Sequence, residues 1–167
     1  MAVNLSARDL GEPELPLRIG RLLSIHGLPP GKLTVEITER AVIGEPETAI
    51  RVLRGLADLG VGIAVDDFGV GQSAFAYLRH LPVSELKIDQ TFVRHLARDA
   101  SDQTIVRSIV ELGHRLGFRV TAEGVEDEGA LEQLAAIGCD HAQGFFIARP
   151  LPATELARFV FERAGVA

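Results

Sequence analysis

The chain has 167 residues, of which 47% are hydrophobic and 24% charged, and it carries a formal net charge of −6. This composition is typical of one globular domain and excludes a disordered or fibrous protein. No apolar run approaches the roughly 18 residues that a membrane span needs, and no signal peptide is apparent. The negative charge argues against DNA or RNA polymers as partners, because nonspecific binding to them needs clustered Lys and Arg. We therefore expect a cytoplasmic protein whose anionic ligands are bridged by metal.

A repeated unit runs along the chain: a short β-branched run, a polar residue at its end, a loop and a helical stretch. The predicted strands are residues 2–5, 33–38, 62–66, 85–89, 119–123 and 140–145. The clearest helices are predicted over residues 47–59 and 101–116. In the second, Ser101 is a suitable cap, and the predicted buried stripe is Ile105, Ile109, Leu112 and Leu116. Four glycines end such stretches, as helix stops do: Gly27, Gly60, Gly117 and Gly138.

Strands that alternate with helices through short connections predict a parallel α/β sheet, either an open doubly wound sheet or a barrel. The residues at the strand ends favour the barrel. Each strand ends in a polar residue, namely Asn4, Glu36, Asp66, Lys87, Glu123 and Gln143. In a TIM-type (β/α)8 barrel all such ends meet at one mouth, whereas an open sheet has one crevice at its switch point. Because a barrel takes about 250 residues, we expect six of its eight units here, with the first two strands missing.

Two adjacent carboxylates, Asp66 and Asp67, follow a predicted strand and precede the glycine-rich segment Phe68-Gly69-Val70-Gly71. Neighbouring anions repel each other, but a divalent cation between them turns the repulsion into attraction, and carboxylate oxygens suit Mg2+ or Mn2+. The alternative is a solvated turn, since such sequences are common in ordinary loops.

Lys87 and Asp89 lie two apart on a predicted strand, so both side chains point to one face. In a barrel that face is the interior, where a charged group is costly unless it is paired or takes part in binding or catalysis. The alternative to a functional role is an ion pair that is only structural. There are two further carboxylate pairs, Glu36 with Glu39 and Glu123 with Glu126. Considered in isolation, each pair would be predicted to lie on the protein surface.

Taken together, the carboxylates, one amide and one lysine at successive strand ends make a mouth that can hold two cations beside an ammonium. Such a site suits phosphodiester cleavage, because two metals bind the phosphate, activate water and stabilise the leaving oxygen. Histidine and cysteine are not needed for this chemistry. The five histidines lack mutual ligand spacing, and the single cysteine, Cys139, excludes a cysteine-based metal cluster.

Six segments, in the order and at the spacing of a known family, carry a resemblance to it. They are Val3-Asn4-Leu5-Ser6, Val35-Glu36-Ile37-Thr38-Glu39, Asp66-Asp67-Phe68-Gly69-Val70-Gly71, Glu85-Leu86-Lys87-Ile88-Asp89, Ala122-Glu123-Gly124-Val125-Glu126 and Ala142-Gln143-Gly144-Phe145. These segments resemble the signatures of EAL domains, the cyclic-di-GMP phosphodiesterase family. The resemblance covers essentially all of residues 1–167 as a single domain, the C-terminal two-thirds of a family barrel.

The resemblance implies a substrate, cyclic-di-GMP, which is hydrolysed to linear pGpG with two Mg2+ or Mn2+ ions. It implies that Asn4, Glu36 and Asp66 ligate one metal, and that Asp67 ligates the second. Lys87 would hold the attacking water or the phosphate, and Glu123 would join the water network as a candidate general base. Three further residues take supporting roles: Glu39 steadies the loop after Asp67, Asp89 positions water or the second metal, and Gln143 lies near the phosphate.

The family's Glu-Ala-Leu glutamate, also a metal ligand, has no counterpart in residues 1–167. We therefore expect weakened metal binding and impaired turnover in this chain, and expect its two free sheet edges to be covered by another copy, as a dimer or larger homo-oligomer. One alternative is a degenerate EAL domain that acts as a cyclic-di-GMP receptor or a protein-interaction module without catalysis. Another is an enolase-like barrel enzyme, which the ordered motifs disfavour.

Overall fold

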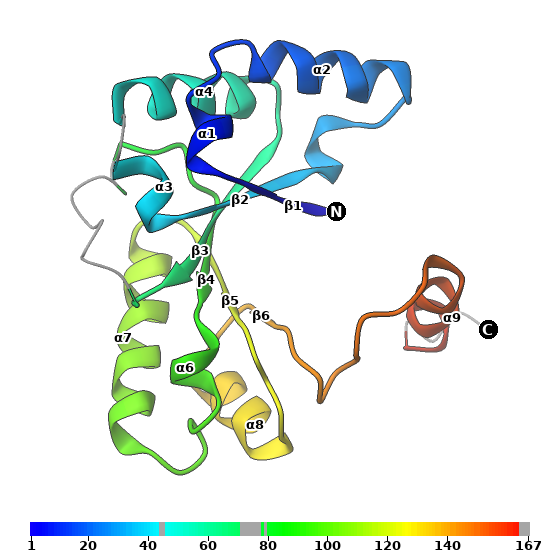
Figure 1. Cartoon of the computed structure of the whole chain (residues 1–167). Helices are drawn as coiled ribbons and strands as arrows, with labels where there is room; N and C mark the ends of the chain where they lie inside the picture. Colours follow the sequence, from blue (N-terminus) through cyan, green and yellow to red (C-terminus); the bar gives the residue numbers. More distant parts are fainter. Residues whose placement is uncertain (44–45, 71–77, 79, 164–167) are drawn as a thin grey trace.

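The computed structural model describes residues 1–43, 46–70, 78 and 80–163, without the side chains of residues 39, 43, 162 and 163, and its centre is one parallel sheet (Figure 1). The strands are β1 (Ala2–Leu5), β2 (Thr34–Thr38), β3 (Gly62–Phe68), β4 (Glu85–Ile88), β5 (Arg119–Ala122) and β6 (His141–Ala142). All six predicted strands are confirmed, although β6 keeps only two residues of the run predicted for it.

The strands are hydrogen-bonded in chain order, so β1 and β6 form the two edges of the described sheet. Successive parallel strands joined by helical connections have the topology of a (β/α)8 barrel, whereas the strand order of an open doubly wound sheet reverses at a switch point. The described part is therefore an arc of six barrel units. No helix within it is both long and apolar enough to cross a lipid bilayer.

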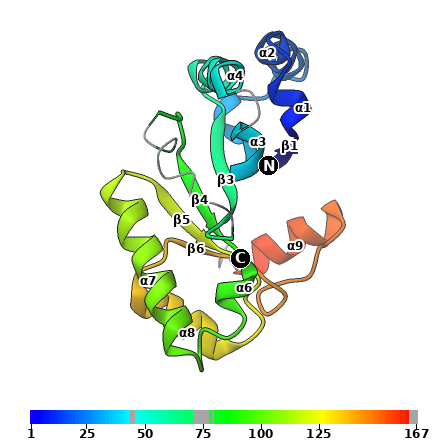
Figure 2. The same ribbon diagram turned by 60° about the vertical axis from the view of Figure 1, so that its left-hand side comes forward.

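Helices follow the strands, and all except α9 gather around the outside of the arc (Figures 1 and 2). They are α1 (Ala7–Leu10), α2 (Leu15–Ile25), α3 (Glu39–Ile43), α4 (Pro46–Asp58), α6 (Gln90–Val93), α7 (Ala100–Arg115), α8 (Glu128–Ile137) and α9 (Ala153–Arg163), with a 3-10 turn η1 at Pro30–Lys32. Helix α4 agrees with its prediction to within one residue at each end. It lies against α2, where a Cβ on Gly55 would come within 2.9 Å of Pro16, so glycine allows the close approach.

Helix α7 is present where it was predicted, but the predicted cap is wrong, and of the predicted stripe only Ile109 is buried. The cap is Asp99, whose carboxylate accepts hydrogen bonds from the backbone N–H of Ser101 at 2.7 Å and of Asp102 at 3.3 Å. The buried residues are Val106, Ile109, Val110 and Gly113, whereas Ile105 and Leu116 are each 38% exposed. The reason is Gly113, where a Cβ would lie 2.5 Å from Val120 of β5, so the helix turns its glycine toward the sheet.

The two faces of the sheet have different chemistry because side chains alternate along each strand. Val35, Ile37, Leu86 and Ile88 are fully buried in the hydrophobic core between the sheet and the helices. The intervening positions place polar side chains on the inner face of the arc, among them Lys87, which is also buried. A buried ammonium on this face must find partners there.

Helix α9 stands apart from the sheet, at the end of an extended arm that follows β6 (Figures 1 and 2). Its apolar residues Leu156, Val160 and Phe161 are 49%, 53% and 62% exposed. An isolated helix of this length is marginal in water, so α9 depends on packing partners for its stability.

Candidate functional site

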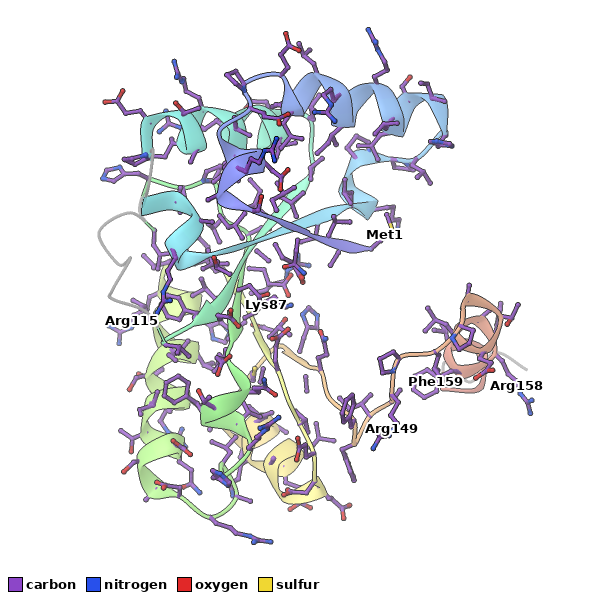
Figure 3. All side chains as sticks on the ribbon, viewed as in Figure 1. Met1, Lys87, Arg115, Arg149, Arg158 and Phe159 are labelled. Atoms are coloured by element: carbon purple, nitrogen blue, oxygen red, sulfur yellow. The ribbon has the colours of Figure 1, made fainter. Side chains whose placement is uncertain are left out.

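The ammonium of Lys87, on β4, lies at the centre of a group of carboxylates from three other parts of the sheet (Figure 3). Its Nζ lies 2.7 Å from Glu36 Oε1, on β2, and 2.5 Å from Glu123 Oε1, which directly follows β5. Asp66 Oδ1, on β3, lies 3.5 Å away. The prediction that polar residues at successive strand ends meet at one mouth is therefore confirmed for these four.

The charge balance of this group favours a further cation. Burial by itself would lower the pKa of Lys87, but hydrogen bonds to Glu123 and Glu36 and the charges of Glu123 and Asp66 outweigh it, so this pKa is raised. The ammonium is thus charged at any physiological pH. One positive charge facing three carboxylates leaves formal negative charge uncompensated, and a divalent cation is the ordinary means of neutralising it.

Glu123 is affected by the same surroundings in the opposite way. Burial raises its pKa, and the charges of Asp66 and Glu36 add to this effect, while the hydrogen bond and charge of Lys87 act against it. The net result is a pKa above the ordinary value for glutamate. A carboxylate with a raised pKa is a stronger proton acceptor, which is the property that a general base needs.

Asp67 sits in an unusual backbone conformation next to Asp66. Strand pairing runs from Val65 with Leu86 to Phe68 with Ile88, so β3 contains one extra residue, a bulge, at the two aspartates. The φ angle of Asp67 is 53°, in the left-handed region, the only positive φ among the described non-glycine residues. The bulge turns both carboxylates toward the mouth instead of sending them to opposite faces.

A carboxylate oxygen from each of Asp66, Asp67 and Glu123 lies within 4.8 Å of the other two. These are hard oxygen donors, which suit Mg2+ or Mn2+. Burial, followed by the charges of Asp66 and Asp89, raises the pKa of Asp67 by more than the charge of Lys87 lowers it. The donor set therefore fits a divalent metal ion.

Asp89 has a structural contact that the sequence reading did not foresee. Its carboxylate accepts a hydrogen bond from the backbone N–H of Thr91 at 2.8 Å and so caps α6. Burial works to raise its pKa, but hydrogen bonds involving Thr91 and Asp67 and the charge of Arg94 hold the pKa of Asp89 below its usual value. Asp89 thus lies beside Asp67, in a position to influence any ion held there.

The other predicted site residues lie around this centre. Asn4 is exposed on β1 and is in register with Glu36 on β2. Gln143 is exposed after β6, where its carbonyl accepts a hydrogen bond from the N–H of Val125 at 3.0 Å. Glu39 begins α3, but its side chain lies outside the described part of the chain.

Two cavities flank the carboxylates, and three polar residues that the sequence reading missed line them. The first, of about 280 Å3, is lined by Gln90, Arg94, Glu123, Gly124, Glu126, Gln143, Gly144 and Phe145. The second, of about 450 Å3, is lined by Thr38, Arg40, Asp67, Val70, Asp89, Gln90 and Thr91. The missed residues are Gln90, Arg94 and Arg40. A sequence signal existed for Gln90 and Arg94, because they stand four residues apart, at the first residue and the C-cap of the helix α6 that follows Asp89.

Comparison with known proteins identifies similar molecules. The EAL domain family model matches residues 1–150. The bifunctional diguanylate cyclase/cyclic di-GMP phosphodiesterase MucR of Pseudomonas aeruginosa is 43% identical over 156 residues, which are 93% of this chain and 23% of that protein. The chain thus spans about a quarter or less of such curated relatives.

Solved structures agree with this result. The PaMucR phosphodiesterase in complex with c-di-GMP superposes with a TM-score of 0.86 at 43% identity, over 93% of this chain and 63% of that one. The EAL domain of Mycobacterium smegmatis DcpA superposes with a TM-score of 0.91 at 37% identity, over 96% and 72% of the two chains.

Proposed function

Since the chain belongs to the EAL domain family, we propose that it binds cyclic-di-GMP and hydrolyses one of its two phosphodiester bonds to give linear pGpG. The observation that carries this proposal is the buried Lys87 ammonium among Glu36, Asp66 and Glu123, next to the oxygen cluster of Asp66, Asp67 and Glu123. Carboxylates that converge beside a fixed ammonium match the needs of phosphodiester hydrolysis, in which anionic charge must be bound and water activated.

Asn4, Glu36 and Asp66 would hold one divalent cation, and Asp67 would hold the second with Asp89 beside it. When bound, such cations lower the pKa of water and offset the charge that develops on the phosphate. Glu123 is the group we assign to proton transfer: its Oε takes a proton from water as the water oxygen bonds to phosphorus and the ester P–O bond breaks. The leaving sugar oxygen then takes up that proton, so that it departs as a hydroxyl and Glu123 is again a carboxylate. Lys87 orients the water or a phosphate oxygen, and its ion pair with Glu123 holds that carboxylate in place.

For the 167-residue polypeptide tested alone, we propose slow turnover, because no residue in it matches the Glu-Ala-Leu glutamate of the family. A missing anionic ligand lowers metal affinity, and the remaining carboxylates must then compensate for the desolvation of the cation. Gln143, which lines the same cavity as Glu123, would lie near the phosphate.

The test is to measure, in the same samples with Mn2+, cyclic-di-GMP binding by calorimetry and pGpG formation by chromatography. We expect binding together with slow, metal-dependent hydrolysis that stops when a chelator is added. Binding without any hydrolysis would instead identify a receptor. Absence of both would contradict the proposed function for this chain.

We also propose that the polypeptide self-associates through the free edge of β1. An unpaired edge strand presents backbone donors and acceptors that a second copy can satisfy, and Val3 on this strand is 44% exposed. Light scattering coupled to size-exclusion chromatography is expected to give a dimer or larger species. Val3→Lys places a charge on this edge and is expected to shift the association equilibrium toward the monomer. A monomeric unsubstituted chain would refute this proposal.

A further inference from the structure

The substrate proposed above carries two phosphodiester groups, and the carboxylate centre accounts for only one of them. The chain's net charge is −6, and the mouth itself is rich in carboxylates, so the second anionic group needs a cationic partner of its own. Lys87 is assigned above to the attacking water or the scissile phosphate, and its ammonium is held there by Glu36, Asp66 and Glu123, so it does not also serve the second phosphate.

Two arginines line the cavities that flank the centre. Arg94, in the smaller cavity, is engaged within the protein: its Nη2 donates to Gln90 Oε1 at 2.7 Å, and its Nε lies 3.3 Å from Glu126 Oε1. Arg40, in the larger cavity, makes no ion pair with any residue that the structure describes. The guanidinium of Arg40 is therefore the cationic group that remains for a ligand.

The position of Arg40 relative to the metal-binding residues supports this assignment. The cavity that it lines also contains Asp67 and Asp89, so a ligand held at Asp67 through a cation extends into the space that Arg40 borders. The volume of about 450 Å3 falls in the range of sites that bind nucleotide-sized molecules. Thr38 and Gln90 add neutral hydrogen-bonding groups to the wall.

We propose that Arg40 binds the second, non-scissile phosphodiester of the cyclic dinucleotide and so distinguishes it from ligands that have one phosphodiester. The inference rests on the proposed function. A guanidinium matches a phosphate because its planar array of N–H donors engages two oxygens at once, which an ammonium does not.

The experiment measures dissociation constants by calorimetry with Mg2+ present for the unsubstituted chain, Arg40→Ala, Arg40→Lys and Arg54→Ala. Arg54 is an exposed arginine on α4 that lines neither flanking cavity, so it controls for the loss of one positive charge. The two probes are cyclic-di-GMP and the dinucleoside monophosphate GpG, which has the same bases and one phosphodiester. Circular dichroism and thermal melting verify that each variant is folded.

For cyclic-di-GMP, Arg40→Ala is expected to raise the dissociation constant about tenfold, with a smaller increase for Arg40→Lys and no change for Arg54→Ala. For GpG, Arg40→Ala is expected to leave the dissociation constant unchanged. The Arg40→Ala effect on cyclic-di-GMP should also shrink as salt is raised.

Equal affinity of Arg40→Ala and the unsubstituted chain for cyclic-di-GMP would overturn the role of Arg40 while leaving the proposed function intact. An equal loss for GpG and cyclic-di-GMP would overturn the assignment to the second phosphate. If the unsubstituted chain binds no cyclic-di-GMP, the proposed function fails, and this inference fails with it.

Discussion

Lys87→Met is expected to abolish hydrolysis and to lower the free energy of unfolding by about 3 kcal/mol in metal-free buffer. The side chain of Lys87 is 7% exposed, and its ammonium contacts Glu36, Asp66 and Glu123, so the substitution leaves buried carboxylates without their partner. Methionine keeps most of the volume, which separates the loss of charge from the loss of packing. For a domain of this size, the change corresponds to a fall in melting temperature of about 10 °C.

The dependence of the unfolding free energy of Lys87→Met on Mg2+ and on pH tests the same role more specifically. Mg2+ should stabilise Lys87→Met more than the unsubstituted chain, because the ion supplies the positive charge that the variant lacks. The folded pKa of Lys87 is raised, so its contribution is complete below the unfolded value of about 10.4 and is lost only as pH rises through the folded pKa. The stability difference should thus be constant between about pH 6 and 9.

The chain offers a matched control, because Lys32 is its other lysine and is exposed on η1. Urea unfolding of Lys87→Met and Lys32→Met, with and without Mg2+, makes the comparison. If the two variants have the same stability, or if Lys87→Met retains hydrolysis, the central role given to this ammonium is wrong.

Asp66→Asn is expected to separate metal binding from folding. The amide is nearly isosteric but removes an anionic oxygen ligand, so Mn2+ affinity should fall about 100-fold or more and hydrolysis should fall with it. Metal-free stability should change by less than about 1 kcal/mol. The reason is that Asp66 is the most distant of the three partners of Lys87, at 3.5 Å.

Glu132→Gln is the control for Asp66→Asn, since Glu132 is an exposed acid on α8 that lines neither flanking cavity. Calorimetric titration with Mn2+, denaturant unfolding and pGpG formation complete the comparison. Unchanged Mn2+ affinity in Asp66→Asn would show that the metal is bound elsewhere.

The sequence predicted the strands and the central cluster because both follow from strict local rules. Alternation along residues 85–89 predicts that the side chain of Lys87 points to the opposite face of the sheet from Leu86 and Ile88. The structure confirms this, with Leu86 and Ile88 in the hydrophobic core and Lys87 among carboxylates. Polar residues at the ends of successive parallel strands must share an edge, so the meeting of Glu36, Asp66 and Lys87 needed no knowledge of loops.

The features that the sequence reading missed depend on packing and on loop geometry. In α7, helical spacing predicted a stripe from Ile105 to Leu116, whereas the close approach of Gly113 to Val120 turns a neighbouring stripe toward the sheet. Similarly, Asp89 was expected to act on water or metal, whereas its contact with Thr91 depends on where α6 begins. Arg40 was missed because a residue's place in a cavity wall is set by the connections between elements, which local periodicity does not encode.

The left-handed backbone at Asp67 has a consequence for engineering. An aspartate in this region costs roughly 1–2 kcal/mol, and its carboxylate also faces those of Asp66 and Asp89. Glycine at position 67 would relieve both costs, and asparagine would relieve the charge repulsion. A library selected for heat resistance alone should therefore enrich these residues at the expense of aspartate. Thermostabilisation of this domain should therefore hold position 67 fixed and seek its gains among the surface helices.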